Sequence, residues 1–157
     1  MKELPFELLE KKVFEFLDEQ EMCVVATCSQ GQPRASAVEF FPRGYFLYIL
    51  TEGGTKMSNL QENPAVSVAI HGRFTGWDSA RGLQVTGLAR IGLHGSDIFE
   101  EAREAYEHRK GLEDIELPEG MYAVKVYPIQ MEYLDTALKA EGYAARHLIR
   151  CGQDDPN

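Results

Sequence analysis

No stretch of this sequence reaches the roughly 18 consecutive apolar residues that a membrane-spanning helix needs. The first twelve residues, MKELPFELLEKK, carry three glutamates and lack the apolar core of a secretory signal. We therefore expect no membrane segment and a cytoplasmic location.

Basic residues are in the minority. The chain has 16 lysines and arginines against 25 aspartates and glutamates, which gives a formal net charge of -9. This balance argues against nucleic acid or an anionic membrane as a partner. It remains compatible with one small basic pocket for a small anion.

Residues that bind metals or act as nucleophiles are few and scattered. The three cysteines and four histidines lie too far apart for a disulfide framework or a zinc site, and we interpret the cysteines as reduced thiols. No Ser-His-Asp order and no Walker loop is visible, so no metal site is expected and no catalytic residue can be named. These residues are Cys23, Cys28, Cys151, His71, His94, His108 and His147.

The composition instead favours one folded domain over residues 1–157, with 44% hydrophobic residues. Amphipathic stripes predict helices over residues 5–20, 55–63 and 96–110, the last capped by Asp97. Alternating or β-branched apolar patterns predict strands over residues 22–29, 33–41, 45–51, 65–72, 83–92, 121–128 and 130–135.

The order of these elements indicates a mainly β fold with α decorations. The first three strands follow one another too closely for crossover helices, which excludes a Rossmann-type sheet. We expect a closed antiparallel barrel over about residues 22–135, with an N-terminal helix at 5–20 and the helix near residue 100 on the outside. The tail over residues 136–157 follows no clear pattern.

One short segment combines features that suit an anion. In TEGGTKMSNLQENP (Thr51 to Pro64), two glycines precede a lysine at the start of a short helix, where a cation is mildly unfavourable. Thr55 is expected to cap this helix, whose free N–H groups would bind phosphate together with Lys56. Gly53 and Gly54 allow a close approach of the backbone. The alternative is a solvated lysine after a flexible turn.

The wider pattern resembles the pyridoxamine 5′-phosphate oxidase-like family of FMN-binding split barrels. The segments that carry the resemblance are VVATCSQGQPRASAVEFF, YFLYILTEGGTKMSNLQENPAVSVAI, LQVTGLARI and the later YAVKVYPIQMEYLD. The resemblance implies an antiparallel split barrel, FMN as cofactor and a homodimer in which two subunits build each flavin site.

The resemblance also implies roles for particular residues. Lys56, with the helix start at Thr55, falls on the lysine that holds the FMN phosphate. Leu50 and Thr51 fall on positions that line the flavin. Gln84 falls on the glutamine that hydrogen-bonds the edge of the isoalloxazine ring.

One phosphate-binding position differs from the family. Ser36 stands where full-length pyridoxamine phosphate oxidases carry an arginine, and Arg34 lies two residues earlier on the same face of the strand. Either Arg34 partly substitutes, or Ser36 donates a weaker hydrogen bond. An ordinary charge on an edge strand is the remaining interpretation of Arg34.

The C-terminal part departs from the oxidases as well. They end with an arginine-x-histidine substrate motif near a tryptophan, whereas here Arg146 and His147 are adjacent and the single Trp77 lies in a mid-chain loop. We therefore expect an FMN-dependent oxidoreductase acting on an unidentified small molecule, not on vitamin B6. The alternatives are a flavoprotein that carries electrons or stores flavin, and a split barrel that binds another ligand such as haem.

Overall fold

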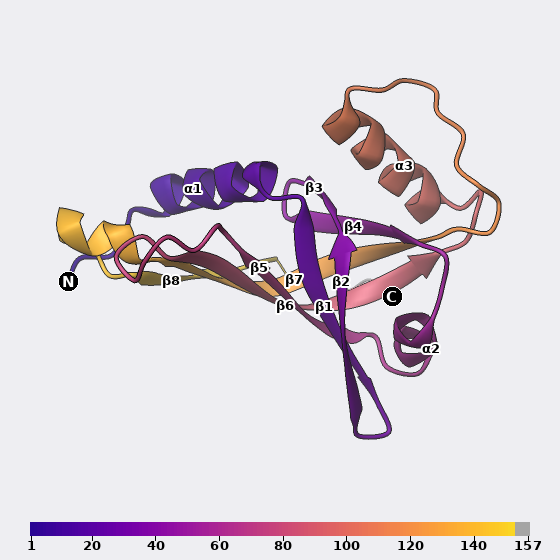
Figure 1. Ribbon diagram of the computed structural model, residues 1–157, viewed down its shortest axis with the longest axis horizontal. Helices are drawn as coiled ribbons and strands as arrows, with labels where there is room; N and C mark the ends of the chain where they lie inside the picture. Colours follow the sequence, from indigo (N-terminus) through magenta and orange to yellow (C-terminus); the bar gives the residue numbers. More distant parts are fainter. Residues whose placement is uncertain (153–157) are drawn as a thin grey trace.

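The computed structural model describes residues 1–152 as a curled β-sheet with helices against it (Figure 1). The helices are α1 (Phe6–Glu19), α2 (Thr55–Glu62), α3 (Asp97–Lys110) and the 3-10 helix η1 (Thr136–Glu141). The strands are β1 (Met22–Ser29), β2 (Gln32–Glu39), β3 (Phe41–Arg43), β4 (Phe46–Thr51), β5 (Ala65–His71), β6 (Arg81–Gly92), β7 (Tyr122–Asp135) and β8 (Arg146–Arg150).

The strands form one sheet in the order β2-β1-β5-β6-β7-β4-β3, with β8 paired to β7, and every ladder between them is antiparallel. This confirms the mainly β class and the split-barrel architecture. The closed barrel is wrong, because within residues 1–152 no ladder joins the end strands β2 and β3. At the junction between them, Phe40 is buried and its N–H donates to Glu21 O (3.1 Å), which extends the pairing with β1 by one residue before β3 begins.

The concave side of the sheet holds the main hydrophobic core, and two helices close it. The first helix, α1, buries one stripe made of Leu9, Val13, Phe16 and Leu17, as the sequence period predicts. The second, α2, adds Met57 and Leu60 to the same core. Because residues alternate along each strand, side chains that do not enter this core point to the outer face.

The last two predicted strands are one strand, β7, interrupted by a bulge at Ile129. Its ladder with β6 shifts register there, so that Gly87 pairs with Pro128 and Thr86 with Gln130. Proline has no N–H for a ladder, and sequence reasoning therefore split the strand at this point. A side chain at Gly87 would come within 2.5 Å of Tyr127 O, which explains the glycine.

The third helix, α3, lies on the outer face against β3, β4 and the first part of β7, as expected (Figure 1). It packs Phe99, Ala102 and Ala105 against the sheet. Its N-cap is Ser96, whose side chain accepts a hydrogen bond from the N–H of Phe99 (3.2 Å). The predicted cap at Asp97 is therefore wrong by one residue.

The tail that showed no pattern contains η1 and β8, and residues 153–157 lie outside the described part of the chain. Asp135 starts η1 by accepting from the N–H of Ala137 (3.2 Å), and β8 then pairs with the second half of β7. No helix within residues 1–152 is long and apolar enough to cross a membrane.

Candidate functional site

The loop between β4 and α2 has the backbone that an anion site requires. Gly53 and Gly54 have φ values of 129° and 107°, which side-chain-bearing residues rarely adopt. Gly54 is the N-cap of α2 and there is no side-chain cap, so the prediction that Thr55 caps this helix is wrong. Thr55 is instead the first helical residue, and among residues 1–152 nothing accepts from the N–H of Thr55 or of Lys56.

Lys56 lies beside these free N–H groups and is half-buried. Its ammonium donates to Gly53 O (3.2 Å), and no carboxylate of residues 1–152 pairs with it. Burial lowers the pKa of Lys56 below its usual value, because the charged form loses solvation without gaining a counter-ion. An anion at this point would supply that counter-ion.

Thr51 and Leu50 end the preceding strand on opposite faces. Thr51 Oγ1 accepts from the N–H of Gly53 (3.4 Å), which places its hydroxyl in the same loop as Lys56. Leu50 instead packs against the cluster under α3. Of the two, only the Thr51 side chain belongs to the Lys56 site, and Leu50 can contribute there only through its backbone.

Ser36 and Arg34 lie on β2, on the concave side of the sheet. Ser36 pairs with the buried Val25 and Arg34 with the buried Thr27, and directly paired residues share a face. Asn59 of α2 donates to Thr27 Oγ1 (3.1 Å), so this helix is fixed over the same end of β1. Both predicted residues therefore lie on the side of the sheet that α2 covers, and Arg34 is exposed.

Gln84 lies elsewhere. It is exposed on the outer face of β6, between the buried Leu83 and Val85, and pairs with Ala69 of β5. Gln84 and Ser36 thus point to opposite faces of the same sheet. Because a ligand cannot pass through a paired sheet, one chain alone does not bring these two residues together.

Arg146 and His147, which differ from the C-terminal motif of the oxidases, make contacts within the fold. His147 is buried inside the fold, 4% exposed, and its Nε2 contacts Ala144 O (2.7 Å). Arg146 points outward and pairs with Glu132 (2.7 Å). Through these contacts, neither side chain faces the loop of Lys56.

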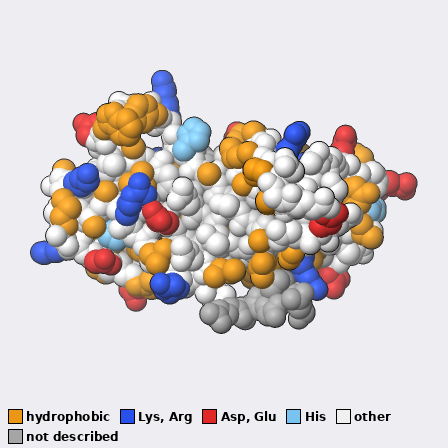
Figure 2. Space-filling model, turned by 90° about the horizontal axis from the view of Figure 1, so that it is seen from below, with side chains coloured by type: hydrophobic (Ala, Val, Ile, Leu, Met, Phe, Trp, Pro, Cys, Tyr) orange, Lys and Arg blue, Asp and Glu red, His pale blue; other side chains and the backbone are white. Residues whose placement is uncertain are grey.

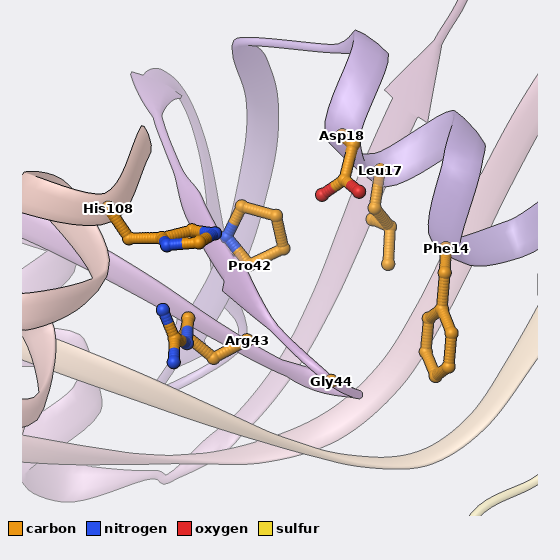
Figure 3. A pocket seen from close by; sticks show the side chains of 7 residues that line it. All are labelled: Phe14, Leu17, Asp18, Pro42, Arg43, Gly44 and His108. Atoms are coloured by element: carbon orange, nitrogen blue, oxygen red, sulfur yellow. The ribbon is translucent and has the colours of Figure 1, made fainter. Parts of the chain in front are cut away.

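Two hollows do not coincide with the Lys56 loop. A cleft of about 240 Å³ separates α1 from the β3–β4 turn and α3, with Arg43 and His108 on one side and the side chains of α1 on the other (Figure 3). It is lined by Phe14, Leu17, Asp18, Pro42, Arg43, Gly44 and His108. A second hollow of about 220 Å³ lies between the β1–β2 turn and α2 and includes Ser58 and Asn59, within a turn of Lys56. Within residues 1–152 no group of His, Cys, Asp and Glu gathers as a metal ion would require.

Sequence reasoning missed the outer face around Gln84, which we call the uncovered face. Small or uncharged side chains alternate along its strands, and this alternation was the available signal. Charged side chains are sparse across the middle of the underside that these strands present (Figure 2). The face consists of Met22, Val24, Ala26, Ala35, Ala37, Ala65, Ser67, Ala69, His71, Gln84 and Thr86.

These features define a class: a mainly β protein built on an antiparallel split barrel, with an anion-ready loop at the start of a short helix. The chain belongs to the pyridoxamine 5′-phosphate oxidase family, whose model matches residues 9–134. No curated protein matches it significantly.

Solved structures show the same fold. ChuZ of Campylobacter jejuni covers 94% of this chain, with 61% of its own length covered, at 18% identity and a TM-score of 0.74. An FAD-binding protein of Mesorhizobium loti covers 77%, with 90% of its own length, at 18% identity and a TM-score of 0.61. HutZ, the heme storage protein of Vibrio cholerae, covers 76%, with 89% of its own length, at 20% identity and a TM-score of 0.60. At such identities the likeness establishes the fold and leaves the ligand open.

Proposed function

We propose that this protein is an FMN-binding oxidoreductase that acts on a small molecule as a homodimer. The observation that carries the proposal is Lys56, a half-buried lysine at an open helix start, with no carboxylate partner among residues 1–152. In a chain with a net charge of -9, such a lysine needs a specific reason.

The donor groups of this loop fit a phosphate. A terminal phosphate accepts hydrogen bonds from backbone N–H groups at a helix start, and no group of the described chain accepts from those of Thr55 and Lys56. The ammonium of Lys56 adds a full positive charge, and the two glycines keep side chains out of the way. Membership in the pyridoxamine 5′-phosphate oxidase family favours a flavin as the molecule that carries this phosphate.

The position of Gln84 supports the homodimer. Gln84 lies on the opposite face of the sheet from Ser36, so a ligand that touches both needs two copies of the chain. The residues that make up the uncovered face are uncharged, and two acidic copies repel each other less across such a surface. The carboxylates paired beside it, Glu39 next to Met22 and Glu132 next to Gln84, form ion pairs with Lys110 and Arg146.

Bound flavin would supply hydride or electron transfer, and the protein would bind and orient it. In this arrangement Lys56 holds the phosphate, the Thr51 hydroxyl lies in the same loop, and the Gln84 amide of a second copy donates to the ring edge.

The test compares FMN with riboflavin, which lacks the phosphate. A charge-assisted hydrogen bond is worth roughly 1.5–3 kcal/mol, so Lys56→Ala should weaken FMN binding about tenfold to a hundredfold and leave riboflavin binding nearly unchanged. Lys139→Ala removes an exposed lysine of η1 and serves as the matched control. Equal losses for both flavins, or no loss, would contradict the proposal.

One observation favours haem as a second candidate ligand. His71 is exposed on the uncovered face, and its Nδ1 contacts Gly72 O (2.8 Å). A carbonyl oxygen only accepts, so Nδ1 carries the proton and Nε2 keeps the lone pair that a haem iron would bind. Adding haemin to wild type and to His71→Ala, and comparing the absorption spectra, tests this ligand; identical spectra would exclude His71 as the axial residue.

A further inference from the structure

The loop between β5 and β6 carries two exposed aromatic side chains. Trp77 is 84% exposed and Phe74 is 61% exposed, and their rings meet edge to face with centroids 5.4 Å apart. Trp77 is the only tryptophan of the chain. Two large aromatic rings held together in solvent are costly unless another surface covers them.

This loop is held in place rather than loosely attached. At its base, the N–H of Ala80 donates to Thr136 Oγ1 (2.9 Å), and the N–H of Thr136 donates to Ala80 O (3.0 Å). Across its tip, the hydroxyls of Thr75 and Ser79 are 2.7 Å apart. The aromatic pair is therefore presented on a braced loop, which lowers the entropy lost on binding.

The loop adjoins the uncovered face. It leaves β5 after His71 and enters β6 at Arg81, and Gln84 follows three residues later on that face. The loop therefore lies at the end of the strands that carry this face, and a surface that covers the face near Gln84 and extends past the strand ends would meet it. A second copy of the chain is the occupant that the charges favour, because two proteins of net charge -9 approach each other best across a surface with few charged side chains. The carboxylates that border this face, Glu39 and Glu132, are both paired with a cation.

We infer that Phe74 and Trp77 close over the flavin site of a second copy, with Trp77 forming one wall of the ring pocket. This inference rests on the proposed function and adds a stacking residue to it. Gln84 and Trp77 then reach the same ligand from the same protomer, while the Lys56 loop of the other copy holds the phosphate. An indole face suits a flat aromatic ring, as it does a nucleic-acid base.

The single tryptophan makes the test direct. In the dimer, the fluorescence emission of Trp77 should lie at a shorter wavelength than that of a solvent-exposed tryptophan and should resist quenching by acrylamide. Addition of FMN should quench this emission. Trp77→Leu should weaken FMN and riboflavin binding by a similar factor, about tenfold, because the contact is to the ring and not to the phosphate. Trp77→Phe should recover most of that loss.

Leu93→Ala is the matched control, since Leu93 is 61% exposed in a different loop and should leave flavin binding unchanged. Circular dichroism checks that each variant folds. If wild type binds FMN while Trp77 stays open to acrylamide and Trp77→Leu binds normally, the stacking role is wrong and the proposed function stands. If wild type binds no flavin, both are overturned.

Discussion

The outer face of the sheet has two regions that differ in what lies against them. Over β4 and the first part of β7, α3 buries aromatic side chains and Ala123, and Phe99 of the helix is only 1% exposed. Over β1, β5 and the first part of β6, no helix of the described chain lies, and the side chains are small or uncharged. The outer face of the sheet is thus covered by a helix of the same chain in one region and left open to another surface in the other.

The region that α3 covers, which we call the covered region, contains a buried lysine that needs several partners. Lys125 of β7 is 7% exposed and lies 4.3–5.6 Å from the ring centroids of Phe46, Tyr48 and Tyr127. Its ammonium pairs with Glu101 of α3 at 2.9 Å. Such a buried cation is tolerated because both the rings and the carboxylate face it. The uncovered face contains no comparable group, so the two regions should respond differently to mutation.

The largest effect is expected from Phe99→Ala in the covered region. Removing a fully buried phenylalanine costs about 3–5 kcal/mol in the free energy of unfolding, through lost burial and the cavity that remains. Val24→Ala on the uncovered face should change the stability of the monomer by far less, because Val24 is 37% exposed. Denaturant unfolding at several protein concentrations measures both; equal losses would remove the distinction between the two regions.

A charge on the uncovered face should break the dimer and spare the fold. Ala69→Glu places two like charges at an interface of two copies, and we expect the dimer dissociation constant to rise about a hundredfold, equivalent to about 2.7 kcal/mol. Ala140→Glu adds the same charge to the exposed end of η1 and is the control. Light scattering over a dilution series checks the prediction, and an unchanged dimer would show that the contact lies elsewhere.

The Lys125 pair should make the covered region sensitive to alkali. Burial lowers the pKa of Lys125, but its contacts with Glu101 and Tyr48 outweigh burial and raise it above the usual value. Because the pKa of Lys125 is higher in the folded than in the unfolded state, its contacts stabilise the folded state fully at pH values below the unfolded pKa, about 10.4. This stabilisation is lost as pH rises through the folded pKa.

Glu101→Gln should therefore lower stability at neutral pH and flatten the alkaline decline. A hydrogen bond to a charged group contributes about 1.5–3 kcal/mol, and the exposure of Glu101 places the loss near the lower end. Unfolding curves from pH 7 to 11 measure the difference. A variant that keeps the wild-type pH profile would show that the pair contributes nothing to it.

The smallest effect is expected from Gln84→Ala on the uncovered face. Losing one neutral hydrogen bond costs on the order of 1 kcal/mol, so FMN should still bind. The absorption spectrum or the reduction potential of the flavin should change more than its affinity, because Gln84 is assigned to the ring edge. An unchanged spectrum and potential would remove Gln84 from the flavin site.

Much of the fold could be read from local pattern. The alternation in AVSVAIHG and LQVTGLARIG identified β5 and β6, and the stripe of Leu9, Val13 and Phe16 identified α1. The turn glycines also placed Lys56 at the start of a helix, as the structure has it. These features depend on residues a few positions apart, which sequence patterns record.

The predictions failed where the local structure depends on an unusual backbone conformation or on a residue distant in the sequence. The N-cap of α2 is Gly54, which has a positive φ and no side chain. Sequence reasoning looked for a capping side chain and therefore assigned the cap to Thr55. The bulge at Ile129 depends on Gly87 in a neighbouring strand, and β8 becomes a strand only because the second half of β7 offers its edge.

For the candidate site, the sequence by itself determined which groups are available: a lysine after two glycines, a serine in place of an arginine, and a glutamine in an alternating strand. Only the tertiary structure decided which face each side chain occupies, because that depends on the pairing register of strands distant in sequence. Register puts Gln84 on the uncovered face and Ser36 on the concave one. The tertiary structure also leaves Trp77 exposed in the loop that joins β5 to β6, since strand ends, not residue types, determine where a loop emerges.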